Sequence, residues 1–341
     1  MSLRQPHIDA LKLVGSQLIV WHHFSAYGPL ADALSQAAPG LMRWLYDYAR
    51  MAVQIFLVVG GFLAVQGLAR TAAGDAGALV RTLGRRYLRL ALPLLAALLL
   101  AVACAGLARL WLNADFIPAA PTPGQVLAHA MLLHGVLGVD ALSAGVWYVA
   151  IDFQLYALLA LLLWAGQRGP CWLGAVLVLG LMVASLLLFN RHAALDNWAV
   201  YFFGAYGLGA AAYWVGQTRR PWIGLGLLAA LGLLALTLDY RTRIALALGV
   251  ALLLGLAQWR GVSGAALPAW LAGPVQALGR TSYALFLLHF PLLLLANALF
   301  AGLGLSGAGA AGALLLLTWA ASMGLAFGFE RWVEAPLARR R

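Results

Sequence analysis

Long apolar stretches of about 20 residues follow one another along the whole chain, separated by short polar segments. A helical stretch of about 20 apolar residues matches the ~30 Å hydrocarbon core of a bilayer. The pattern therefore predicts an all-α, polytopic membrane protein of about ten transmembrane helices. The expected spans are 10–28, 49–69, 88–111, 146–166, 171–189, 197–216, 221–239, 242–259, 281–301 and 309–330.

The composition excludes a soluble protein. Hydrophobic residues make up 64% of the 341 residues and charged residues only 10%, whereas soluble domains carry about 25% charged residues. No polar segment is long enough to fold separately. We therefore expect one membrane domain over residues 1–341, with no appended soluble domain.

The net charge of +11 is distributed unevenly between the two sides that these spans define. Positive charge accumulates on the cytoplasmic side of membrane proteins. With both termini inside, sixteen Lys and Arg residues lie on the inner side, which favours this topology in a bacterial inner membrane. The basic residues are then expected to contact anionic lipid and not nucleic acid. The outer side holds six: Arg43, Arg50, Arg109, Arg191, Arg241 and Arg243.

Two local patterns resemble cofactor sites but lack the required context. Gly302, Gly304 and Gly307 have the spacing of a dinucleotide-binding turn, but they separate two apolar spans and follow no strand. His129 and His134 are five residues apart, which does not place them on one helical face. No carboxylate lies near them with metal-ligand spacing, so no metal site is expected.

Two further segments bear on topology. The stretch 125–139 is apolar but short, so an interfacial or re-entrant segment is expected there and not an eleventh span. The first apolar stretch contains Lys12 and is followed by no cleavage site, so we do not expect a cleaved signal peptide there. Cys104 and Cys171 fall within or at the ends of predicted helices and give no disulfide framework.

Ionisable residues within the spans are the first candidates for function, because such groups are costly in a bilayer. His22 and His23 lie near the outer end of the first span, Asp152 lies in the outer half of the fourth, and His289 lies in the ninth. A histidine beside a carboxylate can act as a general base. The alternative is that each residue makes an isolated hydrogen bond between packed helices.

A cluster of arginines precedes the third span on its inner side. Arg86 and Arg89 are i, i+3 neighbours on one helical face, and Arg81 and Arg85 lie about one turn before them. Paired guanidinium groups bind phosphate, and a helix N-terminus at this point would add favourable partial charge. The alternative is a basic collar that only anchors the helix.

Six motifs occur in order along the chain. The first contains Asp9 and Lys12, with a histidine eleven residues after Lys12 at His23. The second, at 56–63, reads FLVVGGFL, with Gly60 where a serine is usual. The third pairs Arg86 with Arg89 and is followed by a proline.

The fourth motif runs from Trp147 to Tyr156 and includes Tyr148, with Asp152 where a glutamate is usual. The fifth, at 278–291, reads LGRTSYALFLLHFP and contains Ser282, Tyr283 and His289. The sixth is an E-x-P that begins at Glu334. In this order the motifs resemble those of the acyltransferase 3 family of integral membrane acyltransferases.

The resemblance implies transfer of an acyl group, with acetyl as the first expectation, from cytosolic acyl-CoA to a hydroxyl of a surface glycan or related acceptor. Arg86, Arg89 and Lys12 are expected to bind the donor, His23 to act as base, and Asp152 to orient it. Oxyanion stabilisation is left open among backbone N–H groups, Tyr148 and His289. Substrate-binding or structural roles remain for these candidates: Asp9, Trp147, Tyr148, Tyr156, Ser282, Tyr283, His289 and Glu334.

The departures from the family pattern keep other functions open. Lys12 lacks the planar fork of an arginine, Gly60 has no hydroxyl, and Asp152 is one methylene shorter than glutamate. A transporter or flippase of an anionic or lipid-linked substrate is one alternative, although the chain shows no internal repeat of the kind common in transporters. An inactive family member is another. The sequence does not indicate an oligomeric state.

Overall fold

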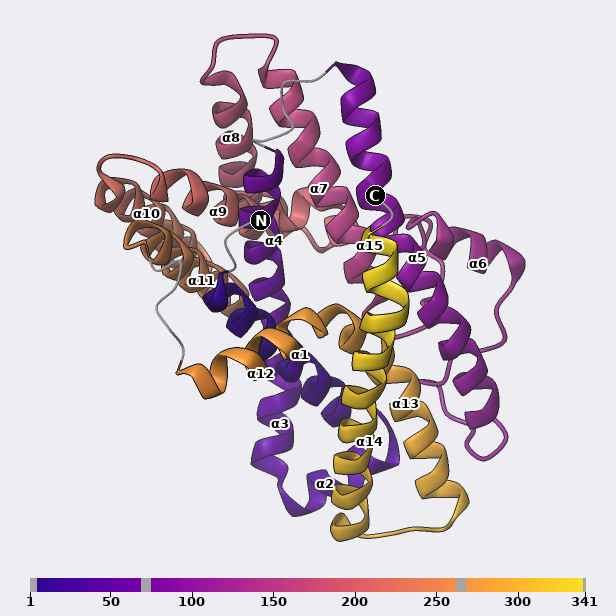
Figure 1. The fold of residues 1–341 in the computed structure, drawn as a ribbon. Helices are drawn as coiled ribbons and strands as arrows, with labels where there is room; N and C mark the ends of the chain where they lie inside the picture. Colours follow the sequence, from indigo (N-terminus) through magenta and orange to yellow (C-terminus); the bar gives the residue numbers. More distant parts are fainter. Residues whose placement is uncertain (1–4, 69–74, 262–267, 340–341) are drawn as a thin grey trace. The chain divides into compact units, whose positions relative to one another are not determined.

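The computed structural model describes residues 5–68, 75–261 and 268–339, and in this part of the chain all regular structure is helical (Figure 1). The chain is thus an all-α polytopic protein, as the sequence predicts. The α-helices are α1 (Pro6–Ala26), α2 (Gly28–Ala37), α3 (Pro39–Tyr48), α4 (Val53–Leu68), α5 (Ala76–Ala108), α6 (Pro123–Ala130), α7 (Val146–Gly166), α8 (Leu173–Leu187), α9 (Ala199–Gly216), α10 (Pro221–Leu238), α11 (Thr242–Trp259), α12 (Ala269–Arg280), α13 (Ser282–Gly302), α14 (Ala308–Phe329) and α15 (Ala335–Arg339).

Each of the ten expected spans corresponds to a helix, and eight helical segments of the described chain are long and apolar enough to cross a membrane. Helices α1 and α9 fall outside this set. Helix α1 carries Asp9, Lys12 and two histidines, and α9 carries three tyrosines and four glycines. These residues lower the mean hydropathy without shortening the helices. The segments that qualify are Pro39–Leu68, Ala76–Ala108, Val146–Gly166, Leu173–Arg191, Pro221–Leu238, Thr242–Trp259, Ser282–Gly302 and Ala308–Leu337.

The chain folds into two compact units, and α1, α5, α7 and α12 each contribute residues to both. The first unit is built around α9. Helices α4, α8 and α11 pack against α9, and α10 packs against α11 (Figure 1). Helix α9 is buried along most of its length, which explains why its surface is not that of a lipid-facing helix.

Two glycines allow α4 and α9 to approach closely. A Cβ atom on Gly61 would lie 1.9 Å from the carbonyl oxygen of Tyr206, and one on Gly209 would lie 1.9 Å from that of Val58. No side chain fits at either position. Small residues at helix crossings serve this purpose in membrane proteins, where the close approach increases van der Waals contact.

The second unit contains α2, α3, α6, α13 and α14 together with most of α1. Helix α14 packs along α13, and α2 packs against both (Figure 1). Asn297 on α13 joins these elements because its Oδ1 accepts the N–H of Leu30 and its Nδ2 donates to the carbonyl of Tyr27. Gly28, with φ of +82°, leaves no room for a Cβ beside that amide.

The start of α5 corrects one expectation from the sequence. The helix begins at Ala76, where Asp75 Oδ1 accepts the N–H of Ala78, and not near residue 88. Arg86 and Arg89 therefore lie inside the helix, more than two turns from its start. The predicted contribution of a helix N-terminus to anion binding at these arginines is wrong.

The structure also describes two of the connecting segments singled out in the sequence. Helix α6 has only eight residues and none of the qualifying segments lies within 125–139. The glycine-rich stretch forms the turn between α13 and α14, where Gly304 and Gly307 have positive φ values. Four residues counted on the inner side lie outside the described residues: Arg4, Arg70, Arg340 and Arg341.

Candidate active site

His23 and His289 form a buried pair in the second unit. His23 lies on α1 with 8% of its surface exposed, and His289 lies on α13 with 0% exposed. His23 Nδ1 is 2.6 Å from His289 Nε2. The other ring nitrogen of His289, Nδ1, donates to the carbonyl of Leu285 at 2.8 Å. The first and fifth sequence motifs thus meet through a direct hydrogen bond between their histidines.

His22 and His23 are adjacent in the sequence but have different surroundings in the structure. His22 is half-buried, and its Nδ1 donates to the carbonyl of Leu45 at 3.3 Å. It makes no hydrogen bond to His289. Of the two adjacent histidines, the one selected by the spacing from Lys12 is the one that joins the buried pair.

Gly145 closes one edge of the pair. It precedes α7 with φ of +83°, and a Cβ at this position would lie 2.9 Å from Phe286 Cζ and 3.7 Å from His23 Cε1. The Phe286 ring in turn lies edge-on to Tyr148, with ring centroids 5.6 Å apart. The backbone before α7 therefore packs directly against the His23 ring, and a larger residue would displace one of these rings.

Asp152 and Arg86 form an ion pair in the first unit. Arg86 Nη2 donates to Asp152 Oδ2 at 2.5 Å, and the Arg86 guanidinium lies 5.0 Å from the centroid of the Tyr156 ring. The Asp152 side chain is 7% exposed and that of Arg86 25%. A carboxylate buried to this extent needs a cationic partner, and Arg86 supplies it. The expectation that Asp152 orients His23 remains a prediction.

Gly60 and Tyr206 complete the surroundings of Asp152. A Cβ on Gly60 would lie 3.1 Å from Tyr206 Cε2 and 3.7 Å from Asp152 Oδ1. The serine usual at this position in the family pattern would therefore stand beside Asp152. Tyr206 is fully buried, and its hydroxyl has no hydrogen-bond partner within the described chain. Nothing in the sequence marked Tyr206 as a candidate, because it lies outside all six motifs.

The third and sixth motifs are also related in space. Glu334 lies at the end of a π-helical turn, Glu330–Glu334, that follows α14. Its Oε1 is buried without a hydrogen-bond partner among the described residues, and the charges of Glu330 and Arg89 act on its carboxylate. π-helical turns within α-helices are frequent at functional sites.

The remaining candidates occupy distinct environments. Tyr283 donates its hydroxyl to the carbonyl of Leu90 on α5 at 3.0 Å, and Ser282 is buried at the start of α13. Trp147 is exposed and lies edge-on to Tyr148. Asp9 lies in the first turn of α1 and Lys12 on its second turn, and both are half-buried.

Residues from different motifs thus contact one another, His23 with His289 and Arg86 with Asp152. The family model of acyltransferase 3, described as an acyltransferase domain, matches residues 6–329. The chain belongs to the acyltransferase 3 family. No curated protein and no solved structure matches the chain with significance.

The match to the acyltransferase 3 family covers nearly the whole chain and includes the first five motifs; the sixth, which begins at Glu334, follows the matched region. The protein is therefore a multi-pass membrane acyltransferase. The substitutions Lys12, Gly60 and Asp152 are departures within the matched region. For Asp152 the shorter side chain still reaches Arg86.

Proposed function

We propose that this membrane acyltransferase transfers an acyl group, acetyl in the first instance, from cytosolic acyl-CoA to a hydroxyl of a surface glycan or related acceptor, in a bacterial inner membrane. The observation that carries the proposal is the environment of His23. Its ring is buried, one nitrogen is held by His289, and the other, Nε2, has no hydrogen bond in the described structure. A histidine held in this way is suited to act as a general base.

The reaction follows from the chemistry of a thioester and a hydroxyl. His23 Nε2 accepts the proton of the acceptor hydroxyl while its oxygen forms a bond to the thioester carbonyl carbon. The resulting oxyanion collapses, the carbon–sulfur bond breaks, and the CoA thiolate leaves. The thiolate then takes the proton from His23, which returns to its starting state. No oxidant, reductant or metal is needed for this balance.

The donor is proposed to bind through Arg86, Arg89 and Lys12. Arg89 is exposed on α5, as are Arg81 and Arg85 one to two turns before it. Phosphate is well matched by guanidinium groups. Arg86 is in a different situation because Asp152 already accepts a hydrogen bond from it. A phosphate at Arg86 must therefore compete with a carboxylate, and the exposed Arg89 is the position at which donor binding is tested.

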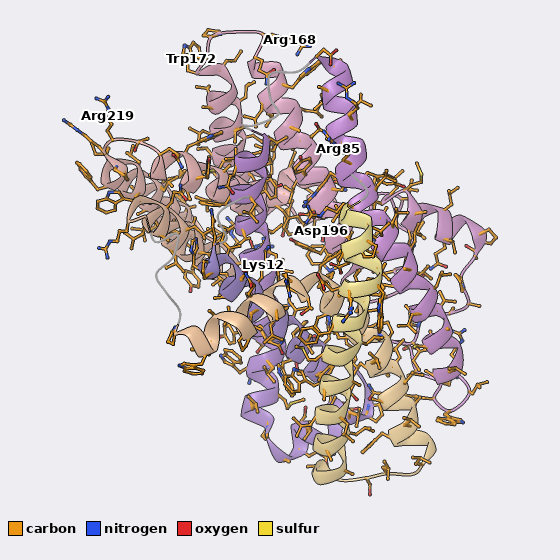
Figure 2. The ribbon with its side chains drawn as sticks, viewed as in Figure 1. Lys12, Arg85, Arg168, Trp172, Asp196 and Arg219 are labelled. Carbon is orange, nitrogen blue, oxygen red and sulfur yellow. The ribbon has the colours of Figure 1, made fainter. Side chains whose placement is uncertain are left out.

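Donor binding can be tested with acetyl-CoA on the purified protein in lipid nanodiscs. A charged hydrogen bond contributes roughly 1.5–3 kcal/mol, so Arg89→Ala should weaken acetyl-CoA binding about tenfold or more. Arg219→Ala is the matched control, because Arg219 is exposed at the turn between α9 and α10 and points away from the helices (Figure 2). Equal losses in both variants would favour a general basic collar.

The acceptor can be tested by mass spectrometry of surface glycans from cells with and without the gene. The proposal predicts that one glycan component loses the mass of one acyl unit when the gene is removed. The size of the difference identifies the acyl group. Identical glycan masses in the two strains would exclude a surface glycan as acceptor.

A further inference from the structure

The two rings of the His23–His289 pair meet edge to edge. Their planes are 5° apart and their centroids 4.9 Å apart, yet the nearest nitrogens are only 2.6 Å apart. Two rings stacked face to face cannot bring a pair of atoms so much closer than their centroids. The rings therefore lie nearly in one plane, with the His23 Nδ1 and His289 Nε2 atoms between them. This is the geometry of a linear N–H···N hydrogen bond.

The direction of that hydrogen bond is set by a backbone carbonyl. The oxygen of Leu285 can only accept, so the His289 nitrogen 2.8 Å from it, Nδ1, must carry a proton. In a neutral imidazole the other nitrogen is then an acceptor. His289 Nε2 accordingly accepts the proton of His23 Nδ1, and the His23 Nε2 lone pair is left available. The reverse order would place two lone pairs against each other at Leu285.

We infer that His289 is a positioning residue that holds His23 in the tautomer with its proton on Nδ1. The Leu285 carbonyl fixes the proton of His289 on Nδ1 and so sets the direction of both hydrogen bonds. The inference rests on the proposed function, in which His23 Nε2 is the base. An imidazole without such a partner can carry its proton on either nitrogen, and when the proton is on Nε2 that atom cannot act as a base. The two hydrogen bonds, from His23 to His289 and from His289 to the Leu285 carbonyl, remove this ambiguity.

The same two hydrogen bonds also stabilise the charged form of His23. When His23 Nε2 takes a proton from the acceptor hydroxyl, the His23 ring becomes a cation with protons on both nitrogens. His289 Nε2 still accepts the Nδ1 proton, and a hydrogen bond from a charged donor is stronger than one from a neutral donor. His289 thus has the orienting role that a carboxylate has in other catalytic sets, but it adds no negative charge to a buried site.

The tautomer can be measured without reference to activity. The chain has seven histidines, so the protein labelled with ¹⁵N at histidine and reconstituted in nanodiscs gives a small set of ring signals. The ¹⁵N chemical shifts distinguish a protonated from an unprotonated ring nitrogen. We expect both His23 and His289 to carry the proton on Nδ1. Signals are assigned by their loss in His23→Gln and His289→Gln, with His22→Gln as the control neighbour.

Two substitutions at position 289 separate positioning from packing. His289→Gln keeps a carbonyl oxygen that can accept from His23 Nδ1–H, whereas His289→Leu offers no acceptor. His289→Leu should shift the His23 proton toward Nε2 and lower kcat about 100-fold or more, the lower range of a general-base effect, with acetyl-CoA binding unchanged. His289→Gln should keep the wild-type tautomer and most of the activity. A purely structural role would make the two variants equally defective and leave the tautomer unchanged.

The outcomes also distinguish this inference from the proposed function. If His23 in the wild-type protein carries its proton on Nε2, the positioning role is refuted whatever the activity, and this holds even where His289→Leu fails to fold. If His23 has the expected tautomer but His23→Ala transfers acetyl groups at the wild-type rate, the tautomer assignment stands and the proposed function fails.

Discussion

The second unit contains two pairs of neighbouring histidine rings that differ in geometry and hydrogen bonding. His23 and His289 lie edge to edge and share a hydrogen bond. His129 and His134 have ring centroids 4.2 Å apart with planes 3° apart, and they share no hydrogen bond. The first pair has a donor–acceptor order with an available nitrogen at one end. The second pair is stacked, so neither ring orients the protons of the other.

The partners of the second pair point to a structural role. His129 Nδ1 donates to the carbonyl of Gln125 and its Nε2 accepts the N–H of Leu142, so both nitrogens join backbone groups of the segment around α6. His134 is 2% exposed, and neither of its nitrogens has a hydrogen-bond partner in the described chain. The comparison teaches that burial alone does not distinguish the two pairs. The arrangement of donors and acceptors around the rings does.

Removing each pair as a whole should give the largest contrast. The double variant His23→Ala/His289→Ala should lower the rate of CoA release from acetyl-CoA about 10²–10⁴-fold, the range of a lost general base. His129→Ala/His134→Ala should keep a rate close to wild type while lowering the thermal stability. Rates per folded protein in nanodiscs would measure both effects. Equal losses of rate would remove the distinction between the two pairs.

A second contrast uses two glycines with positive φ, one beside the His23–His289 pair and one four residues after His134 in the sequence. Gly145→Ala would place a Cβ 2.9 Å from Phe286, next to the His23 ring, and small displacements of catalytic groups can lower rates by about 10²-fold. Gly138, which follows His134, has a similar positive φ of +63° but nothing within 4 Å of a Cβ. Gly138→Ala should therefore have only the conformational cost of about 1–2 kcal/mol, with the rate retained. A larger rate loss in Gly138→Ala than in Gly145→Ala would contradict this assignment.

The smallest predicted effect is a dependence of the α6 segment on pH. Burial, and then the proximity of His129, lowers the pKa of His134 from 6.5 to about 4. The unfolded segment therefore binds more protons than the folded one between these two values, so its stability is complete above pH 6.5 and decreases as the pH falls toward 4. Hydrogen exchange of the amides of 123–142, corrected for the intrinsic pH effect, should show this loss of protection.

The matched variants for this measurement are His134→Phe and His192→Gln. A phenyl ring can stack on His129 but takes no proton, so His134→Phe should remove most of the acid sensitivity of the segment. His192 is exposed in the connection between α8 and α9, and its replacement should leave the sensitivity unchanged. Acid sensitivity that persists in His134→Phe would assign the effect to another group.

The sequence predicts the helices well where apolarity decides them and less well where it does not. Ten expected spans all coincide with helices, but the first 12 residues of α5, Ala76–Tyr87, were missed. This segment contains three arginines and is less apolar than the rest of the helix. A signal for its start was present at Asp75, which caps the helix through Ala78. The topology with both termini inside remains a prediction.

The site shows a similar division. The spacing from Lys12 selected His23, and the motif around His289 was identified, but neither pattern indicates that the two rings share a hydrogen bond. The motifs assign Arg86 to the acyl donor and Asp152 to His23, and nothing in them indicates the ion pair that Arg86 and Asp152 form with each other. Tyr206 had no sequence signal, because its position depends on the close approach of α4 and α9.

The central claim, that His23 is the catalytic base, can be tested most directly by single-turnover acetyl transfer with His22→Ala and His23→Ala side by side. Both variants should bind acetyl-CoA as the wild-type protein does. His23→Ala should transfer the acetyl group at least about 100-fold more slowly, whereas His22→Ala, whose ring contacts Leu45 and not His289, should keep most of the wild-type rate. Wild-type transfer by His23→Ala, or loss of transfer in His22→Ala alone, would contradict the account.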